Sequence, residues 1–190
     1  QSIKQAGHQV AIRDEDGYTD HFDHVVVATQ ANHALRLLGA PTSDEEKTLG
    51  TFRYEPSSIV LHRDENLLPP NRESWSPVNF IRSPNESAPM ASIWMNAVQS
   101  DLRTTRPIFQ SWNPIMEPRE DLTLGAARFE RPLVDAYTEE GVRGIERLHD
   151  EPNRRIWFCG SYAGYGIPLL ESAASSAVRA ARCIGVEAPI

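Results

Sequence analysis

Three glycines within seven positions, Gly160, Gly164 and Gly166, form the part of the sequence best suited to hold a ligand. They lie between a short apolar segment and a stretch rich in alanine and serine. Glycine lets the backbone adopt a positive φ and approach a bound molecule. The free N–H groups at a helix start favour a phosphate, a carboxylate or the electron-rich edge of a reduced flavin. A tight strand-to-helix connection without a ligand explains the pattern equally well.

The residues around these glycines predict a buried strand followed by a helix. The segment RIWFC before Gly160 is apolar enough for a strand covered on both faces. Pro168 suits the first turn of a helix, and small or apolar residues recur at helical spacing from Leu169 to Ile184. Gly185 then ends the helix.

The first 42 residues predict a β-hairpin, a buried strand and a short helix. Val10 and Ile12 alternate with polar neighbours, and Gly17 supplies the turn. The segment HVVVAT that follows is β-branched throughout, as in a strand buried on both faces. Further on, Ser43 and Glu46 have capping-box spacing, and we interpret the acidic run around them as a solvated helix start.

The middle of the chain, residues 51–131, has short strand candidates separated by proline-rich and polar loops, which predicts an antiparallel sheet. His62 is either a polar group of a substrate cavity or a structural residue. Tryptophans 75, 94 and 112 either line an apolar tunnel or pack in the core, and core packing is the better interpretation for at least two of them. Further candidates for orienting a substrate are Asn79, Asn96 and Asn113.

Composition excludes several functional classes. A net charge of -7 without a lysine or arginine block disfavours nucleic acid and anionic membranes as main partners. No apolar run reaches the length of a membrane span. Cys159 and Cys183 form neither a disulfide framework nor a metal site. We interpret both as small buried thiols in a reducing, cytoplasmic compartment.

Two blocks of sequence resemble parts of known flavoproteins. Residues 22–35, FDHVVVATQANHAL, resemble the strand and turn found mid-chain in flavoproteins with two dinucleotide-binding domains, although Gln30 replaces a glycine there. Residues 157–181, WFCGSYAGYGIPLLESAASSAVRAA, resemble the C-terminal flavin motif of the flavin-containing amine oxidase superfamily. The middle segment is similar to the bacterial branch of predicted NAD/FAD-binding, amine oxidase-like proteins.

The resemblance implies a set of FAD-binding residues. Gly160 and Ser161 fall where the family brings backbone near the ribityl chain and pyrophosphate, and Thr29 falls near the adenosine end. Residues 166–170 fall at the helix start that faces the pyrimidine edge of the flavin. Tyr162 flanks the loop and is a further contact or a lid over the core. The predicted set is Thr29, Gly160, Ser161, Tyr162, Gly166, Ile167, Leu169 and Leu170.

This sequence departs from its relatives at two points. Ser161 stands where many flavoproteins have an acidic residue. Ile167, Pro168 and Leu169 stand where close relatives have a histidine and an acidic residue. We therefore predict no catalytic residue.

The implied fold class is α/β (α+β). It combines a partial FAD/NAD(P)-binding sheet from the two chain ends with an antiparallel β substrate-domain insert that carries helices. The expected domains are residues 1–42, part of the FAD-binding domain, residues 43–150, a substrate-type domain, and residues 151–190, the C-terminal FAD-binding strand and helix.

No G-x-G-x-x-G follows a strand in this sequence. The resemblance therefore implies the C-terminal fragment of an FAD-dependent oxidoreductase that transfers a hydride from substrate to flavin. FAD would belong to the full-length parent and be absent from the fragment, which alone would be inactive. The implied partners are the N-terminal half of the same protein, a small apolar or amine substrate, and a second copy through exposed sheet edges. The alternative is a non-catalytic structural or interaction module on a degenerate flavoprotein scaffold.

Overall fold

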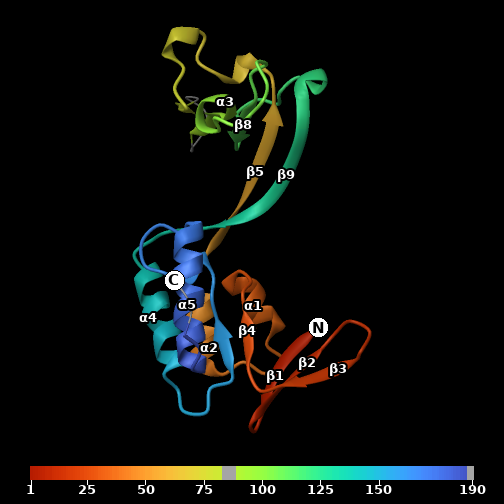
Figure 1. The fold of residues 1–190 in the computed structure, drawn as a ribbon, viewed down its shortest axis with the longest axis vertical. Coiled ribbons are helices and arrows are strands. Elements are labelled where there is room, and N and C mark those ends of the chain that lie inside the picture. The colour runs from red at the N-terminus through yellow and green to blue at the C-terminus, as the bar shows by residue number, and fades with distance from the viewer. Residues whose placement is uncertain (83–88, 188–190) are drawn as a thin grey trace. The chain divides into compact units, whose positions relative to one another are not determined.

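The computed structural model of the protein describes residues 1–82 and 89–187. The chain divides into two compact units (Figure 1). The first unit combines both ends of the chain, residues 1–54 and 132–190, and the second comprises residues 55–131. The predicted mixture of helices with antiparallel sheets is confirmed.

The first unit begins with a three-stranded antiparallel sheet. Its strands are β1 (Ser2–Ala6), β2 (Gln9–Arg13) and β3 (Thr19–Phe22). The β2–β3 hairpin is the one that the alternation of Val10 and Ile12 predicts, and Gly17 takes a φ of 86° in its turn. The sequence analysis did not include β1, which extends this hairpin by one strand.

A parallel pair of short strands lies at the centre of the first unit. Strand β4 (Val25–Val27) pairs with β10 (Ile156–Phe158), so residues from the two ends of the chain become neighbours. Successive side chains of a strand point to opposite faces. Accordingly Ile156 and Phe158 lie in the main core, whereas Trp157 and Cys159 pack with Ala180 of helix α5 (Leu170–Ile184).

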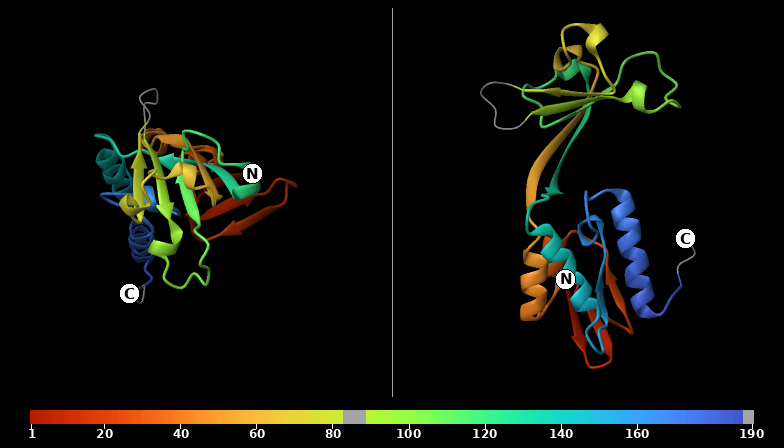
Figure 2. Two further views of the ribbon diagram at one scale, coloured as in Figure 1. Left: turned by 90° about the horizontal axis from the view of Figure 1, so that it is seen from above. Right: turned by 90° about the vertical axis from the view of Figure 1, so that its left-hand side faces the viewer.

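Helices cover both faces of this strand pair. Helices α1 (Ala31–Leu37), α2 (Ser43–Gly50) and α4 (Thr138–His149) supply residues to the main core, and α5 packs on the opposite face (Figure 2, right). A short 3-10 helix, η4 (Ser161–Ala163), connects β10 to α5. The unit is therefore a three-layer arrangement with the parallel strands in the middle.

Two glycines inside α4 allow it to pack closely against α2. A β-carbon on Gly144 would lie 2.7 Å from Thr48 Cγ2, and one on Gly141 would lie 2.7 Å from Phe52 Cζ. Both distances are shorter than a carbon–carbon contact permits. The sequence suggests a weakened helix at these glycines, and the packing gives the reason that they are present.

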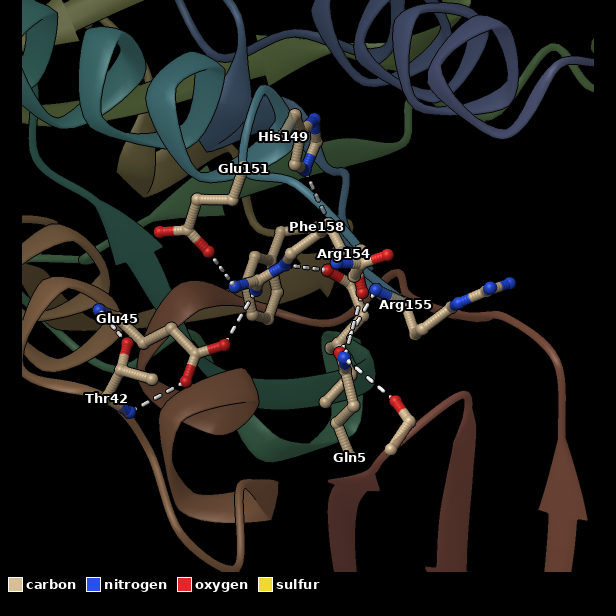
Figure 3. Close-up of polar contacts among 11 residues, drawn as sticks. Gln5, Thr42, Glu45, His149, Glu151, Arg154, Arg155 and Phe158 are labelled. Carbon is tan, nitrogen blue, oxygen red and sulfur yellow. Dashed lines mark hydrogen bonds and ion pairs between the residues drawn. The ribbon is translucent and has the colours of Figure 1, made fainter.

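A buried ion pair joins α2 to the segment that enters β10 (Figure 3). Arg154 Nη2 lies 2.7 Å from Glu45 Oε1, and both side chains are almost fully buried. Arg154 also contacts Glu151, 3.1 Å away, and donates from Nε to the Ile156 carbonyl. The Gln5 side chain donates to Asn153 O at 2.9 Å and accepts from the Arg155 N–H at 3.1 Å, which connects β1 to the same segment.

The start of α2 differs from the sequence-based expectations in two respects. The capping box of α2 is formed by Thr42 and Glu45, one residue earlier than predicted: Thr42 Oγ1 accepts from Glu45 N at 3.1 Å and Glu45 Oε2 accepts from Thr42 N at 2.8 Å. Ser43 is thus the first helical residue rather than the N-cap. The acidic run is also not wholly solvated, because Glu45 uses its second oxygen to bind Arg154.

The second unit is built on a five-stranded sheet with strand order β6-β7-β8-β5-β9 (Figure 2, left). Its hydrophobic core contains Leu67, Leu68, Met90 and Phe109, with Trp75 and Trp94 packed against them. The strands are β5 (Tyr54–His62), β6 (Val78–Ile81), β7 (Met90–Trp94), β8 (Phe109–Trp112) and β9 (Thr123–Pro132), and the short helices are η1 (Glu65–Leu67), η2 (Arg72–Ser74), α3 (Met95–Val98) and η3 (Glu120–Leu122).

The chain leaves the first unit and returns to it at neighbouring points. Leu133 N donates to Arg53 O at 2.9 Å, and the Arg53 guanidinium pairs with the Asp135 carboxylate. Helices α2 and α4 lie outside these crossing points and belong to the first unit, whereas the sequence analysis grouped both with the middle segment. Their apolar faces complete the core around Leu49, Val142 and Ile145. Among the described residues no helix is long and apolar enough to cross a membrane.

The buried ion pair gives a stability prediction. Replacing Arg154 with methionine leaves the Glu45 carboxylate buried without its partner, which costs roughly 3–5 kcal/mol. We expect a correspondingly lower midpoint in urea denaturation. The matched control is Arg147→Met, which removes an exposed pair with Glu140 and should leave the midpoint unchanged. Equal effects of the two substitutions would contradict a structural role for the buried pair.

Candidate functional site

The carboxyl ends of the two parallel strands bring two predicted site residues together. Cys159 N donates to Val27 O at 3.2 Å, and this bond aligns the strand ends. A β-carbon on Gly160 would lie 3.5 Å from Thr29 O, so the two residues are neighbours. Ligands of open α/β sheets bind outside the carboxyl ends of the strands. Thr29 and Gly160 occupy such a position.

Gly160 is held in a conformation that other residues rarely adopt. Its φ is 151°, and a β-carbon there would lie 2.9 Å from Tyr162 Cε1. Its N–H donates to Ser176 Oγ at 2.9 Å, and the same hydroxyl lies 2.9 Å from Gly160 O and 2.8 Å from Ala173 O. Ser176 is buried in α5 and therefore fixes the glycine loop to the helix. The sequence analysis missed this residue, because a serine within a helix gives no signal of a partner so distant in sequence.

Tyr162 belongs to the core. Its ring packs edge-on against Phe52 with centroids 4.9 Å apart, and only 4% of the residue is exposed. Burial raises the pKa of its phenol well above the usual range. Within the described residues its hydroxyl has no hydrogen-bond partner. Of the two interpretations of this tyrosine, the burial of its ring against Phe52 favours the lid over the core.

The start of α5 is exposed and apolar. The helix begins at Leu170, so Pro168 lies just before it rather than in its first turn. No side chain caps this end. Ser172 Oγ donates to Ile167 O at 2.9 Å and fixes the approach to the helix. The exposed fractions of Ile167, Leu169 and Leu170 are 70%, 59% and 90%.

The three glycines of the loop differ in the space that surrounds the position of a side chain. Gly160 is required by the Tyr162 ring, and a β-carbon on Gly164 would lie 3.1 Å from Ser172 Cβ. Internal packing therefore accounts for both. Gly166 has a φ of 83° and open space around it. Ser161, next to Gly160, is half-buried. Thr29 and most of the segment 166–170 are exposed, and Gly160 is half-buried.

His149 is a buried titratable residue that the sequence analysis did not single out. Its Nε2 accepts from Phe158 N at 3.0 Å, and its ring packs edge-on against Trp157. Burial lowers its pKa to about 4, and the nearby charges of Arg154 and Arg179 act in the same direction. It lines a cavity of about 290 Å³ between α4 and α5, which none of the eight predicted residues lines.

The polar candidates of the second unit are mainly structural. His62 is fully buried, with Ser111 Oγ 2.8 Å from Nε2 and Asp64 N donating to Nδ1 at 3.1 Å. Burial lowers its pKa. Asn113 has a φ of 46° and accepts from Ser58 N at 2.9 Å, as a turn residue does. Asn96 and Asn79 bond mainly to backbone groups of neighbouring loops and strands.

The cysteines differ from each other. Cys159 is buried, as expected, and burial raises its pKa. Cys183, in the last turns of α5, is exposed rather than buried. In residues 1–82 and 89–187 no three histidine, cysteine or acidic side chains are arranged to hold a metal ion.

The glycine loop gives a second prediction. Gly160→Ala places a side chain at a positive φ and against the Tyr162 ring, and we expect a loss of about 1–3 kcal/mol in the free energy of unfolding. Gly125→Ala, where no atom lies within 4 Å of the added carbon, is the control and should change little. A neutral Gly160→Ala substitution would show that the Tyr162 ring does not occupy this position.

His149 gives a pH prediction. Its pKa is about 4 in the folded protein and about 6.5 when unfolded. As the pH falls from about 7 toward about 4, the unfolded chain takes up a proton that the folded protein does not. The free energy of unfolding should therefore fall by about 2–3 kcal/mol and then level off. His149→Gln retains an acceptor for Phe158 N and should flatten this dependence in denaturation measurements. An imidazole that titrates near its ordinary value by NMR would contradict the prediction.

Comparison with known proteins gives a fold but no sequence family. No protein-family profile matches the chain, and no curated protein matches it. Among solved structures it is similar to a candidate protoporphyrinogen oxidase from Exiguobacterium sp. 255-15, with a TM-score of 0.62, 12% identity and coverage of 97% of this chain and 45% of that one. It is also similar to a CLA-producing fatty acid isomerase from P. acnes, with a TM-score of 0.55, 12% identity and coverage of 95% and 46%.

A third similar structure is the cyclohexylamine oxidase from Brevibacterium oxydans IH-35A, with a TM-score of 0.64 and 10% identity. The match covers 97% of this chain and 47% of that one. The chain thus spans less than half the length of each of these three proteins. The resemblance to flavin-containing, amine oxidase-like proteins that the sequence suggests is confirmed at the level of the fold, and the chain has the fold of part of these enzymes.

Proposed function

We propose that this chain forms one wall of the cofactor site in an FAD-dependent oxidoreductase of the amine oxidase type. The observation that carries the proposal is the meeting of the β4 and β10 carboxyl ends beside the glycine loop, in a chain with the fold described above. A strand–loop–helix connection without a ligand accounts for the glycine loop, but it does not account for the parallel partner strand beside the loop. The parallel partner strand makes it a position where ligands of α/β sheets bind.

The proposed cofactor contacts follow from that geometry. Backbone at Thr29, Gly160 and Ser161 would approach the ribityl and phosphate part of FAD. The uncapped start of α5 offers N–H groups to an electron-rich ring edge, and Ile167 and Leu170 are free to shield that edge from water. When bound, the flavin accepts the hydride, and the protein contributes orientation and the exclusion of water. No side chain of this chain is assigned an acid or base role.

The open edge of β4 supports an N-terminal partner segment. On β10, the outward-facing backbone is bonded to side chains: Phe158 N donates to His149 Nε2, and Ile156 O accepts from Arg154 Nε. On β4, no described strand pairs with the edge away from β10, and the Val26 side chain is 45% exposed. A further strand can therefore join beside β4 but not beside β10. We assign this edge to the N-terminal half of the same protein, with pairing to a second copy as the competing occupant.

The substrate proposal is an amine or a small apolar molecule. One similar structure is named as a cyclohexylamine oxidase and another as a fatty acid isomerase, which span these two classes. We assign the second unit, residues 55–131, to the substrate side of the parent enzyme. The free thiols of Cys159 and Cys183 fit a reducing, cytoplasmic setting.

A non-catalytic scaffold is the second candidate. The observation in its favour is that packing within the chain accounts for Gly160 and Gly164, so the loop does not need a ligand to explain them. In addition, tyrosine is the only ionisable residue type between positions 160 and 170. Such a module would retain the fold for binding a partner at β4.

Flavin binding separates these candidates. We expect a parent protein with its N-terminal half to purify with a flavin absorption band, whereas the 190-residue chain should bind FAD weakly or not at all, because it supplies only part of the contacts. Leu170→Asp in the parent should lower FAD occupancy without unfolding, since this side chain is 90% exposed in the chain and a carboxylate there would repel the electron-rich ring edge. A folded, colourless parent would refute the flavin proposal, and full FAD occupancy of the short chain would refute the one-wall assignment.

A further inference from the structure

The five-stranded sheet carries apolar residues on both of its faces. Directly opposed residues of antiparallel strands share a face, so the strand register assigns each side chain. The face toward the core carries a row of polar residues, Asn79, Ser92 and Ser111, one on each of three neighbouring strands. The opposite face carries two rows that are apolar apart from one glutamine. They are Phe80, Ala91, Trp112 and Ile59, and Val78, Ile93, Gln110 and Leu61.

The polar row is fully satisfied within the unit. The Asp64 N–H can only donate, so His62 Nδ1 is its acceptor and Nε2 carries the proton. That proton is donated to Ser111 Oγ at 2.8 Å, Ser111 donates to Ser92 Oγ at 2.6 Å, and Ser92 donates to Leu67 O at 3.0 Å. These hydrogen bonds use the polar groups of the row, so no group is left for a ligand. They also fix the polar row on the core face of the sheet.

The apolar face is accessible. Phe80 is 73% exposed and Val78 43%, and the remaining residues of the two rows are half-buried. Antiparallel sheets normally present alternating polar residues to water on their outer face. A contiguous apolar surface of this kind marks a binding site rather than scattered exposure. The apolar rows on the side of the sheet away from the core therefore point to a ligand on the outer face.

The Arg131 cation borders this face. Arg131 Cζ lies 4.4 Å above the centre of the Trp112 ring, and Phe129 packs edge-on against the same ring. Arg131 is exposed and has no ion pair among the described residues. An arginine held flat on an aromatic ring keeps its N–H groups directed for a carboxylate. The face thus combines an apolar strip with one carboxylate-binding group.

We propose that this face, the Trp112 face, binds a long-chain fatty acid. The carboxylate pairs with Arg131, and the hydrocarbon chain crosses Trp112 toward Phe80. Arg131 lies over Trp112 of β8, and Phe80 of β6 is two strand spacings away, about 10 Å, so the carboxyl half of a long acyl chain crosses these strands. A neutral apolar ligand would leave the Arg131 cation without a role. The proposal concerns binding by the second unit alone, and it stands whether or not the protein uses a flavin.

Quenching of tryptophan fluorescence by a dibrominated stearate tests this site. The chain has four tryptophans, and Trp75 and Trp94 pack in the core on the opposite side of the sheet. We expect saturable quenching that Trp112→Phe abolishes and Trp75→Phe preserves. Arg131→Gln should weaken binding of the acid by about tenfold or more. The matching brominated stearyl alcohol should bind both forms alike.

Arg72→Gln is the matched control, because Arg72 also lies over a tryptophan, with Cζ 5.0 Å from the centre of the Trp75 ring. It should leave acid binding unchanged. Circular dichroism verifies that each variant is folded. The proposal fails if quenching is absent, if Trp112→Phe leaves it intact, or if acid and alcohol respond equally to Arg131→Gln. It also fails if Phe80→Ser converts a dimer into monomers, since the face would then be covered by a second copy.

Discussion

The buried Arg154–Glu45 pair is the interaction on which the rest of the first unit depends. A charged pair removed from water is stable only when its remaining hydrogen-bonding groups find partners. Here Glu45 also closes the cap of α2, and Arg154 also bonds Glu151 and the Ile156 carbonyl. The pair thereby fixes the start of β10 against α2, and β10 in turn aligns with β4. The positions of Thr29 and Gly160 follow from that alignment.

Close packing determines the glycine loop as strongly as any ligand would. Ser176 bonds the Gly160 N–H from α5, and the Tyr162 ring occupies the space where a side chain on Gly160 would lie. Contacts within the chain therefore hold the loop in one conformation. A preorganised surface loses less conformational entropy on binding, so the contacts that stabilise this loop would also favour the cofactor proposed above.

The sequence predicts the local elements well where periodicity or turn chemistry is strong. The β2–β3 hairpin, the β4 strand and helix α5 follow from alternation, β-branching and glycine placement. The long-range contacts were not predictable. Glu45 looks solvated in the sequence because its partner is Arg154, far along the chain. The Ser43 and Thr42 positions offer nearly equivalent caps in the sequence, and in the structure Thr42 is the cap.

The same limit applies to the candidate site. The glycines and the helix start are visible in the sequence as a pattern, but the burial of Tyr162 depends on Phe52 from another segment. Likewise, the sequence shows the three tryptophans of the middle segment but not the faces of the sheet on which they lie. The register of β7 and β8 directs Trp112 away from the core that contains Trp75 and Trp94.

The paired crossing points at Arg53 and Leu133 have an evolutionary consequence. The two ends of the second unit leave the first unit side by side. The first unit can therefore keep the same structure when the segment between these ends changes. Loops with adjacent ends tolerate changes of length at a small entropic cost. Residues 55–131 can therefore diverge, lengthen or be exchanged as a cassette, while the Glu45–Arg154 pair keeps the surrounding scaffold intact.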